Sequence, residues 1–299
     1  ITEGLVGSEM CIRDRPKTGT TTLQQYLFPH LDAVNYIGVL QPRQFNGSAS
    51  YNALKSFVVF GEGRLEDARR ILDEEIKQGL PVLISEEEIL IGQFHGAQRG
   101  EATSVSYKEK IERLAKVVEG KKTLAVVALR EFRSGLFSYY VELSHLFGPK
   151  EDIPSLVRSS DLFGIWRYPE LKTTLTDAFG SDVVWQRFPD NMEPATLQAF
   201  WGAQPSVTLP RSNSRVKSLT HVEHTTMQGL LLLASRAAPT SKLGKLFRHL
   251  HRMGWDLKWK RRSHVPFWGS EIWQQLAHVE AASNTTMEEV CGALPNPTS

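Results

Sequence analysis

Short apolar and amphipathic segments alternate along the chain and predict an ordered succession of strands and helices. Short apolar runs bounded by turn residues are typical of buried strands. Four such runs lie at Val34–Leu40, Pro81–Ser85, Thr123–Leu129 and Asp182–Phe188. Apolar residues that recur every three or four positions predict helices. These helices are expected at Thr20–Phe28, Gly63–Gly79, Tyr107–Glu119, Arg133–Phe147 and Glu170–Phe179.

The alternation of strands and helices predicts an α/β fold. Strands separated by helices pair in parallel, and the helices cover both faces of the sheet, which gives three layers with a central parallel sheet. From Met192 onward the pattern is mostly helical, with interruptions around residues 205–215 and near Pro266. We therefore expect one domain over residues 16–299, made of an α/β core at 16–190 and a mainly helical part at 191–299.

Composition narrows the class of protein without fixing it. The 299 residues are 41% hydrophobic and 23% charged, which is ordinary for a globular protein, and the net charge of +2 fits an anionic ligand but predicts no nucleic-acid partner. The two cysteines, Cys11 and Cys291, build no disulfide framework, and the histidines lack the partners of a metal site, so no metal is expected. The apolar run at 229–235 is far shorter than the ~20 residues of a membrane span.

The segment Pro16–Gln24, with the sequence PKTGTTTLQ, has the chemistry of an anion-binding loop. Gly19 allows close backbone approach or a positive φ, and the residues Thr20–Thr22 bring hydroxyls and amide donors to the start of a helix. Lys17 adds a movable positive charge. A simpler interpretation, a capped helix with a surface lysine, stays open on these residues alone.

The order of residues in this loop separates two kinds of phosphate site. The nucleoside-triphosphatase loop places its lysine after the last glycine, whereas Lys17 precedes Gly19. The order PKTGTTTLQ instead resembles the 5′-phosphosulfate loop of the sulfotransferases that use 3′-phosphoadenosine 5′-phosphosulfate (PAPS). The resemblance implies that Lys17 and the residues Thr18, Gly19, Thr20, Thr21 and Thr22 hold the phosphosulfate.

A second segment, Val126–Tyr140, resembles the family's 3′-phosphate site. There a strand ends in arginine and a serine follows eight positions later, as Arg130 and Ser138 do here. The geometry is sensible in itself, because ligands of open α/β sheets bind at the carboxyl ends of strands. Ser134 and Ser138 are four residues apart and so share one helix face. By itself, Arg130 could also be a surface residue that caps the strand.

The third segment is a predicted strand that runs into three acids at Glu86, Glu87 and Glu88. It resembles the Ser-x-Glu turn of the bacterial and carbohydrate-type branches of the family, where a glutamate is the proposed base. By that spacing the base is Glu87, with Glu86 and His95 as alternatives. An acidic cap on the following helix is the simpler interpretation.

Together these resemblances imply a PAPS-dependent sulfotransferase with a nucleotide-binding core of the phosphate-loop type. The acceptor would be a hydroxyl or amine of a small molecule or glycan, with a carbohydrate or glycolipid favoured by the glutamate-type base. The desulfated nucleotide PAP would be the product, and no metal is required. A bacterial member would meet PAPS in the cytoplasm. A kinase-like nucleotide-binding enzyme, a non-catalytic anion-binding protein and an inactive fragment are the alternatives, and the oligomeric state stays open.

Residues 1–15 depart from this pattern. The family places an apolar strand directly before the loop, but charged Arg13, Asp14 and Arg15 stand there. The stretch from Val6 to Arg15 resembles the conceptual translation of a sequencing-library adapter, which recurs in metagenomic predictions. We therefore expect residues 1–15 to be a non-native leader and the first strand of the sheet to be missing.

Overall fold

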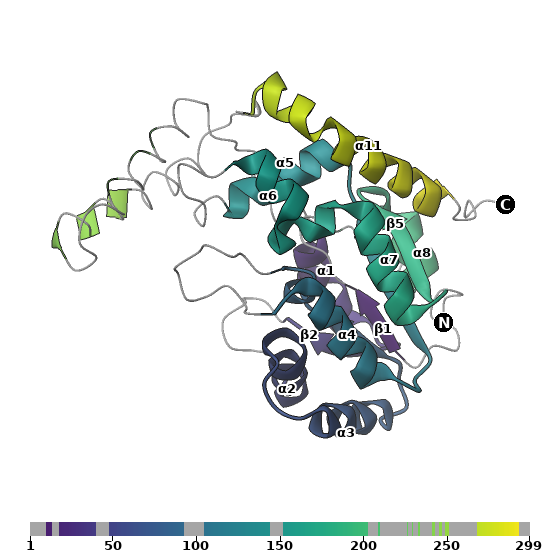
Figure 1. The fold of residues 1–299 in the computed structure, drawn as a ribbon. Helices are drawn as coiled ribbons and strands as arrows, with labels where there is room; N and C mark the ends of the chain where they lie inside the picture. Colours follow the sequence, from purple (N-terminus) through teal and green to yellow (C-terminus); the bar gives the residue numbers. More distant parts are fainter. Residues whose placement is uncertain are drawn as a thin grey trace.

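A parallel sheet runs through the middle of the computed structural model (Figure 1). The structure describes residues 10–13, 18–39, 48–92, 105–143, 152–202 and 268–292, with a few single residues between 209 and 250. Within these residues the sheet has five strands in the order β2-β3-β1-β4-β5. The strands are β1 (Met10–Arg13), β2 (Asn35–Gly38), β3 (Val82–Ser85), β4 (Thr123–Leu129) and β5 (Val183–Arg187).

The central strand β1 contradicts the expectation that the first strand is missing. Met10 pairs with Val82 of β3 on one side and with Thr123 of β4 on the other, and the pairing continues in parallel register to the end of β1. The pairing uses main-chain N–H and C=O groups, which every residue except proline provides. The apolar run Met-Cys-Ile was therefore long enough for a strand. Whether residues 1–15 are native stays a prediction.

Within the described residues, the other predicted strands and helices are confirmed, with ends that differ by a few residues. The end of the helix predicted at Arg133–Phe147 and most of the residues between 203 and 267, which were predicted to be mainly helical, lie outside the described residues. Two helices of the described residues were not predicted, namely α2, which continues into a π-helical turn, and α6. The helical elements are α1 (Thr20–Tyr26), η1 (Phe28–His30), α2 (Ala49–Lys55), η2 (Ser56–Phe60), α3 (Leu65–Ile76), η3 (Glu87–Ile89), α4 (Tyr107–Val118), α5 (Phe132–Leu143), α6 (Ile153–Ser159), η5 (Asp161–Trp166), α7 (Tyr168–Phe179), η6 (Asp190–Met192), α8 (Pro194–Trp201) and α11 (Ser270–Gly292).

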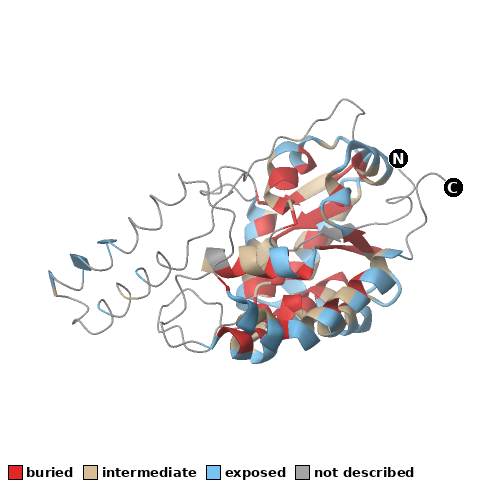
Figure 2. Cartoon of the chain, turned by 90° about the horizontal axis from the view of Figure 1, so that it is seen from above, coloured by how far each residue is buried: buried red, intermediate tan, exposed pale blue. Residues whose placement is uncertain are grey.

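Helices cover both faces of the sheet, as the alternation of side chains along the strands requires. On β4, Val126 belongs to an apolar cluster with α1 and α8, whereas Val127 and Leu129 face a cluster formed mainly by α4, α5 and α7. On β3, Leu83 faces the first side, while Val82 and Ile84 face α2 and α3. Figure 2 shows the buried residues gathered along the strands and on the helix faces turned toward them.

Local signals in the sequence fix where two of these helices lie. Ser106 and Glu109 form a capping box at the start of α4, in which each side chain accepts the other residue's backbone N–H. Gly79, three residues beyond the end of α3, has a φ of 86°, which a residue with a side chain rarely adopts.

The described residues near the C-terminus form the helix α11, which packs against α5, α6 and α7. Its apolar side chains cover the apolar cluster on that face of the sheet.

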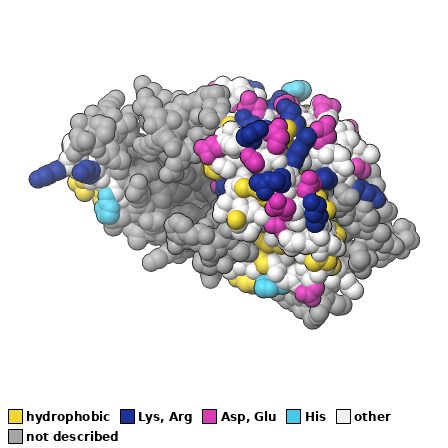
Figure 3. Space-filling view, turned by 90° about the horizontal axis from the view of Figure 1, so that it is seen from below, with side chains coloured by type: hydrophobic (Ala, Val, Ile, Leu, Met, Phe, Trp, Pro, Cys, Tyr) yellow, Lys and Arg dark blue, Asp and Glu magenta, His cyan; other side chains and the backbone are white. Residues whose placement is uncertain are grey.

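The exposed surface carries charges of both signs. On the face seen in Figure 3, lysine and arginine side chains are interspersed with acids. On α3, Arg70 contacts both Asp67 and Glu74. Because these side chains are exposed, such pairs add little to the free energy of unfolding.

A buried leucine in β3 and an exposed leucine just before it give a stability test. Leu83 is fully buried against the α1–α8 side, whereas the side chain of Leu80 is 41% exposed. We expect Leu83→Ala to lower the free energy of unfolding by about 2–5 kcal/mol, because it leaves a cavity. The matched Leu80→Ala should change it by less than about 0.5 kcal/mol. Urea denaturation measures both, and equal effects would contradict the layer assignment.

Candidate functional site

The residues Thr18–Thr20, which lead into α1, are packed against the rest of the protein. Gly19 is the N-cap of α1 and has a φ of 82°, and a Cβ added there would lie 2.7 Å from the sulfur of Met192. Thr18 and Thr20 are buried, with their hydroxyl oxygens 3.5 Å apart. The Asn191 amide donates to the carbonyl of Thr18 at 3.4 Å. The positive φ therefore favours glycine at position 19, and a side chain there would displace the flexible end of Met192.

The loop meets the acids that follow β3. The hydroxyl of Thr21 donates to Oε1 of Glu87 across 3.4 Å, and the buried amide of Gln24 donates to Oγ of Ser85 at 3.0 Å. These two contacts join the first turns of α1 to the carboxyl end of β3. Glu87 thus lies beside Thr21 of the predicted phosphate loop.

The neighbouring acid, Glu86, is committed to other contacts. It is 2% exposed, forms an ion pair with Lys55 at 3.1 Å and accepts a hydrogen bond from the hydroxyl of Tyr51. Its second carboxylate oxygen accepts the backbone N–H of Glu88 at 2.9 Å. These contacts make Glu86 a structural support for the turn, which favours Glu87 as the acid that faces the loop.

Two lysines from different helices hold the acidic turn in place. Lys55 of α2 bridges Glu86 and Glu88, with an Nζ–oxygen distance of 3.0 Å to Glu88. Lys110 of α4 is fully buried and donates to the carbonyls of Glu88 at 3.0 Å and Ile91 at 2.6 Å. Burial lowers the pKa of Lys110 to about 8 from its ordinary value of 10.5. Neither lysine could be recognised from the sequence as a partner of the acidic turn, because both lie on amphipathic helices far from any motif.

Arg130 leaves the carboxyl end of β4 and turns toward α5. Its Nε donates to Oγ of Ser134 at 3.4 Å, its guanidinium carbon lies 5.2 Å from the ring centroid of Phe188, and its carbonyl accepts a hydrogen bond from the hydroxyl of Tyr168. Ser138 is half-buried on α5, one turn beyond Ser134. The predicted pair is thus arranged around the first two turns of one helix.

The start of α5 is capped by an acid. Glu131 accepts the backbone N–H of Arg133 at 2.9 Å and that of Ser134 at 2.7 Å. Although burial by itself would raise the pKa of Glu131, these hydrogen bonds and the charge of Arg130 lower it below its ordinary value. The carboxylate therefore stays ionised and orients the first turn of the helix.

The sheet order brings these three segments to one edge. Because β3, β1 and β4 are neighbours and parallel, the loops that follow them all start from the same edge, about 4.8 Å apart from strand to strand. The chain passes from β1 to β2 and β3 on one side of β1, whereas the later strands β4 and β5 lie on its other side. A reversal of this kind is the place where open α/β sheets bind ligands.

Some predicted and supporting residues need separate mention. Lys17 and His95 lie outside the residues that the structure describes. Asn191 and Tyr168, which contact the loop and Arg130, were not predicted as site residues. Asn191 could have been anticipated, because it lies shortly after the last predicted strand and the loops that follow parallel strands meet at one edge of the sheet. Tyr168 could not, since its partner is a backbone carbonyl.

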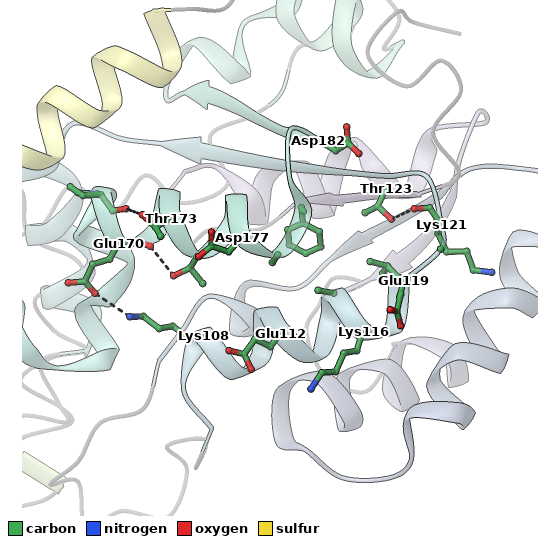
Figure 4. Close-up of a pocket in the computed structure, with 17 residues that line it drawn as sticks. Lys108, Glu112, Lys116, Glu119, Lys121, Thr123, Glu170, Thr173, Asp177 and Asp182 are labelled. Atoms are coloured by element: carbon green, nitrogen blue, oxygen red, sulfur yellow. Dashed lines mark hydrogen bonds and ion pairs between the residues drawn. The ribbon is translucent and has the colours of Figure 1, made fainter.

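A groove of about 950 Å³ lies between α4 and α7, away from this edge. Its lining includes Thr123, which starts β4, and Asp182, which precedes β5, so it opens at the amino ends of these strands. Figure 4 shows Lys108 and Glu170 paired across it, at 3.7 Å. Of the predicted loop, acid and arginine residues that the structure describes, none lines this groove, so it is separate from the described part of the candidate site.

Comparisons with known proteins identify no family for this chain. No family model and no curated protein sequence matches it. The chain is similar to a solved sulfotransferase from Alicyclobacillus acidocaldarius, with 14% identity and a TM-score of 0.41, over 82% of this chain and 98% of that one. That similarity is too distant to indicate a function. Among the described helices, none has the length and apolar character needed to cross a membrane.

The buried lysine gives a pH test of the acidic turn. The folded protein releases the Lys110 proton near pH 8, whereas an unfolded chain keeps it to about pH 10.4. Between these values the unfolded state binds more protons, so the free energy of unfolding rises with pH. In this pH window, the free energy of unfolding of the wild type should rise relative to that of Lys110→Met by up to about 1.4 kcal/mol per pH unit.

Urea denaturation of both proteins at pH 7.5, 8.5 and 9.5 measures the difference, and subtraction removes the titration of other groups. A difference that does not change with pH would mean that Lys110 titrates normally and is not buried as described.

Proposed function

We propose that this protein is a PAPS-dependent sulfotransferase, with a site of the phosphate-loop type at the carboxyl ends of β3, β1 and β4. The observation that carries the proposal is the contact between Thr21 and Glu87, which joins the phosphosulfate-like loop to an acid at 3.4 Å. This contact joins two of the motifs, and the strand order puts the end of β4, from which Arg130 extends, at the same edge of the sheet. The match of the loop to that of the PAPS sulfotransferases supports the same proposal.

The residues around this edge fit a nucleotide with phosphate groups at both ends of its ribose. The first amides of a helix lack acceptors within the helix, although in α1 the N–H of Thr22 already donates to the carbonyl of Gly19 at 3.0 Å. Thr18–Thr22 would bind the 5′-phosphosulfate with these amides and hydroxyls. Arg130 and Ser138 would bind the 3′-phosphate, since arginine grips phosphate oxygens in a fork. Lys17 would add positive charge beside the phosphosulfate.

PAPS would supply the sulfuryl group, and the chain would supply position and charge. Glu87 would accept the proton of the acceptor hydroxyl as the new bond from that oxygen to sulfur forms. Lys17 and the loop amides would stabilise the negative charge that develops on the 5′-phosphate oxygen as its bond to sulfur breaks. In this way the proton ends on Glu87 and the leaving electron pair on PAP. None of these steps requires a metal ion.

The acceptor class follows from the kind of base. A carboxylate such as Glu87 resembles the base of the branches that act on carbohydrates, so we propose a carbohydrate or glycolipid hydroxyl. A small-molecule hydroxyl or an amine is compatible with the same proton transfer. We place the reaction in the cytoplasm, where PAPS is made in bacteria that carry this family.

Nucleotide binding can be tested without knowledge of the acceptor. A ligand that binds only the folded state stabilises it by mass action, by about 2.7 kcal/mol when its concentration is a hundred times the Kd. We expect PAP to raise the melting temperature of the chain and ATP with magnesium to leave it unchanged. A shift with ATP–magnesium alone would favour a kinase-like enzyme, and no shift with PAP would contradict the proposal.

The two acids give a matched test of the base. We expect Glu87→Gln to lower the rate of sulfuryl transfer by about a hundredfold or more while PAP binding is unchanged, because only proton transfer is lost. Glu86→Gln should instead lower the melting temperature, since removing one partner of a buried ion pair typically costs about 3–5 kcal/mol. Transfer assays with a panel of glycan acceptors, below the melting temperature of each variant, decide between them. Full activity in Glu87→Gln would exclude this residue as the base.

A further inference from the structure

The backbone around Arg130 is fixed by a residue from a different layer of the fold. Tyr168 is 1% exposed at the start of α7, and its hydroxyl donates to the carbonyl of Arg130. Its ring stacks edge-on against Phe132, with ring centroids 6.5 Å apart. The hydroxyl is therefore held at the carboxyl end of β4, where the arginine side chain begins.

Tyr168 is in turn fixed by the C-terminal helix. The backbone N–H of Tyr168 donates to Oγ of Ser283 at 3.3 Å, and the same Oγ donates to the carbonyl of Trp166 at 2.9 Å. Ser283 is fully buried in α11. A single hydroxyl thus satisfies one donor and one acceptor in the chain segment that enters α7, which is the full pairing that such a buried group requires.

The same segment also sets the position of α5. A Cβ added to Gly135 would lie 2.3 Å from the indole ring of Trp166, so the ring packs directly on the backbone of α5 between Ser134 and Ser138. The pair Trp166 and Tyr168 therefore contacts both the arginine and the helix that carries the two serines.

A second contact joins α11 to the start of α5. Arg133 donates from Nε to one carboxylate oxygen of Glu280 at 2.6 Å and from Nη2 to the other at 3.0 Å. Glu280 and Ser283 are three residues apart and so lie on one face of α11, which crosses α5 and α7 (Figure 1). One helix face therefore supports both halves of the Arg130–Ser138 arrangement.

We infer that Tyr168 and Ser283 are positioning residues for the 3′-phosphate subsite, so that the C-terminal helix sets the selectivity for nucleotides that carry a 3′-phosphate. This inference rests on the proposed function, because it assigns Arg130 to that phosphate. Neither residue touches the nucleotide. Ser283 acts on Tyr168, and Tyr168 acts on the main chain of Arg130.

The test compares two nucleotides that differ in one phosphate. Isothermal titration gives the Kd of PAP and of adenosine 5′-monophosphate, which lacks the 3′-phosphate, for each variant of the full chain. We expect Tyr168→Phe and Ser283→Ala each to weaken PAP by about five- to tenfold, the effect of losing one ordinary hydrogen bond, and to leave adenosine 5′-monophosphate unchanged. Because the two residues act in series, the double variant should lose little more than the stronger single variant.

The matched control is Tyr139→Phe. Tyr139 is also 1% exposed, and its hydroxyl donates to the carbonyl of Leu162 at 3.2 Å, away from Arg130. We expect its melting temperature to fall as much as that of Tyr168→Phe, with no change in the ratio of the two Kd values. Equal losses for both nucleotides in Tyr168→Phe would mean a merely structural role and would overturn the inference.

Arg130→Ala separates this inference from the proposed function. If that variant leaves the ratio of the two Kd values unchanged, the 3′-phosphate subsite and the function proposed with it are wrong. If it abolishes the preference for PAP while Tyr168→Phe and Ser283→Ala both keep it, the subsite is correct and the positioning role of the C-terminal helix is overturned.

Discussion

The parallel pairing of β1 with both of its neighbours is the interaction on which the rest of this structure depends. Only four residues form the strand, yet they separate β3 from β4 and pair with each through the main chain. Without them, β2 and β3 would form one pair and β4 and β5 another, with no hydrogen bonds between the pairs. The acids after β3 and the arginine after β4 would then have no fixed distance. The geometry of the candidate site is therefore a property of the sheet order more than of any single side chain.

Acidic side chains cluster after β3 at this edge, and their charge is compensated by the partly buried Lys55 and the buried Lys110. Glu86, Glu88, Lys55 and Lys110 all lie within hydrogen-bonding distance of the same short turn. Burial of charged groups is costly unless each is paired. A turn held in this way gains a defined conformation, since any shift would leave a carboxylate or an ammonium group without its partner. The middle acid, Glu87, accepts a hydrogen bond from Thr21 of the loop.

Much of the fold could be predicted from the sequence, and the failures have physical causes. Thr123–Leu129 was predicted to the residue because a buried strand of a parallel sheet is apolar on both faces. The strand β1 was missed because main-chain pairing to two neighbours can order a run too short to be recognised by its pattern. The helix α2 was missed because its polar residues hide the periodicity. The loop, the acid and the arginine were proposed as site residues from motifs, and their position at one edge of the sheet follows from the parallel order of the strands.

The residues that support the candidate site could not be predicted, because their contacts join residues that are far apart in the sequence. Tyr168 and Ser283 are 115 residues apart. The hydroxyl of Tyr168 donates to a main-chain carbonyl, and because every residue has such a carbonyl, the sequence does not mark this partner. Lys110 resembles an ordinary surface lysine until the packing of α4 against the turn buries it. Sequence patterns predict where a helix or strand forms, whereas these contacts depend on which helices and strands the tertiary structure brings together.

The place of α11 in the chain has a consequence for how the protein is made. A ribosome releases the chain from its amino end, and domains form as their residues emerge. The sheet and all the helices up to α8 precede residue 268, whereas Ser283 and Glu280 come later. A nascent chain can therefore pair its strands while the segment entering α7 still lacks its partner hydroxyl. Of the elements that the structure describes, α11 emerges last, so it completes the surroundings of Arg130 after the sheet can already have formed.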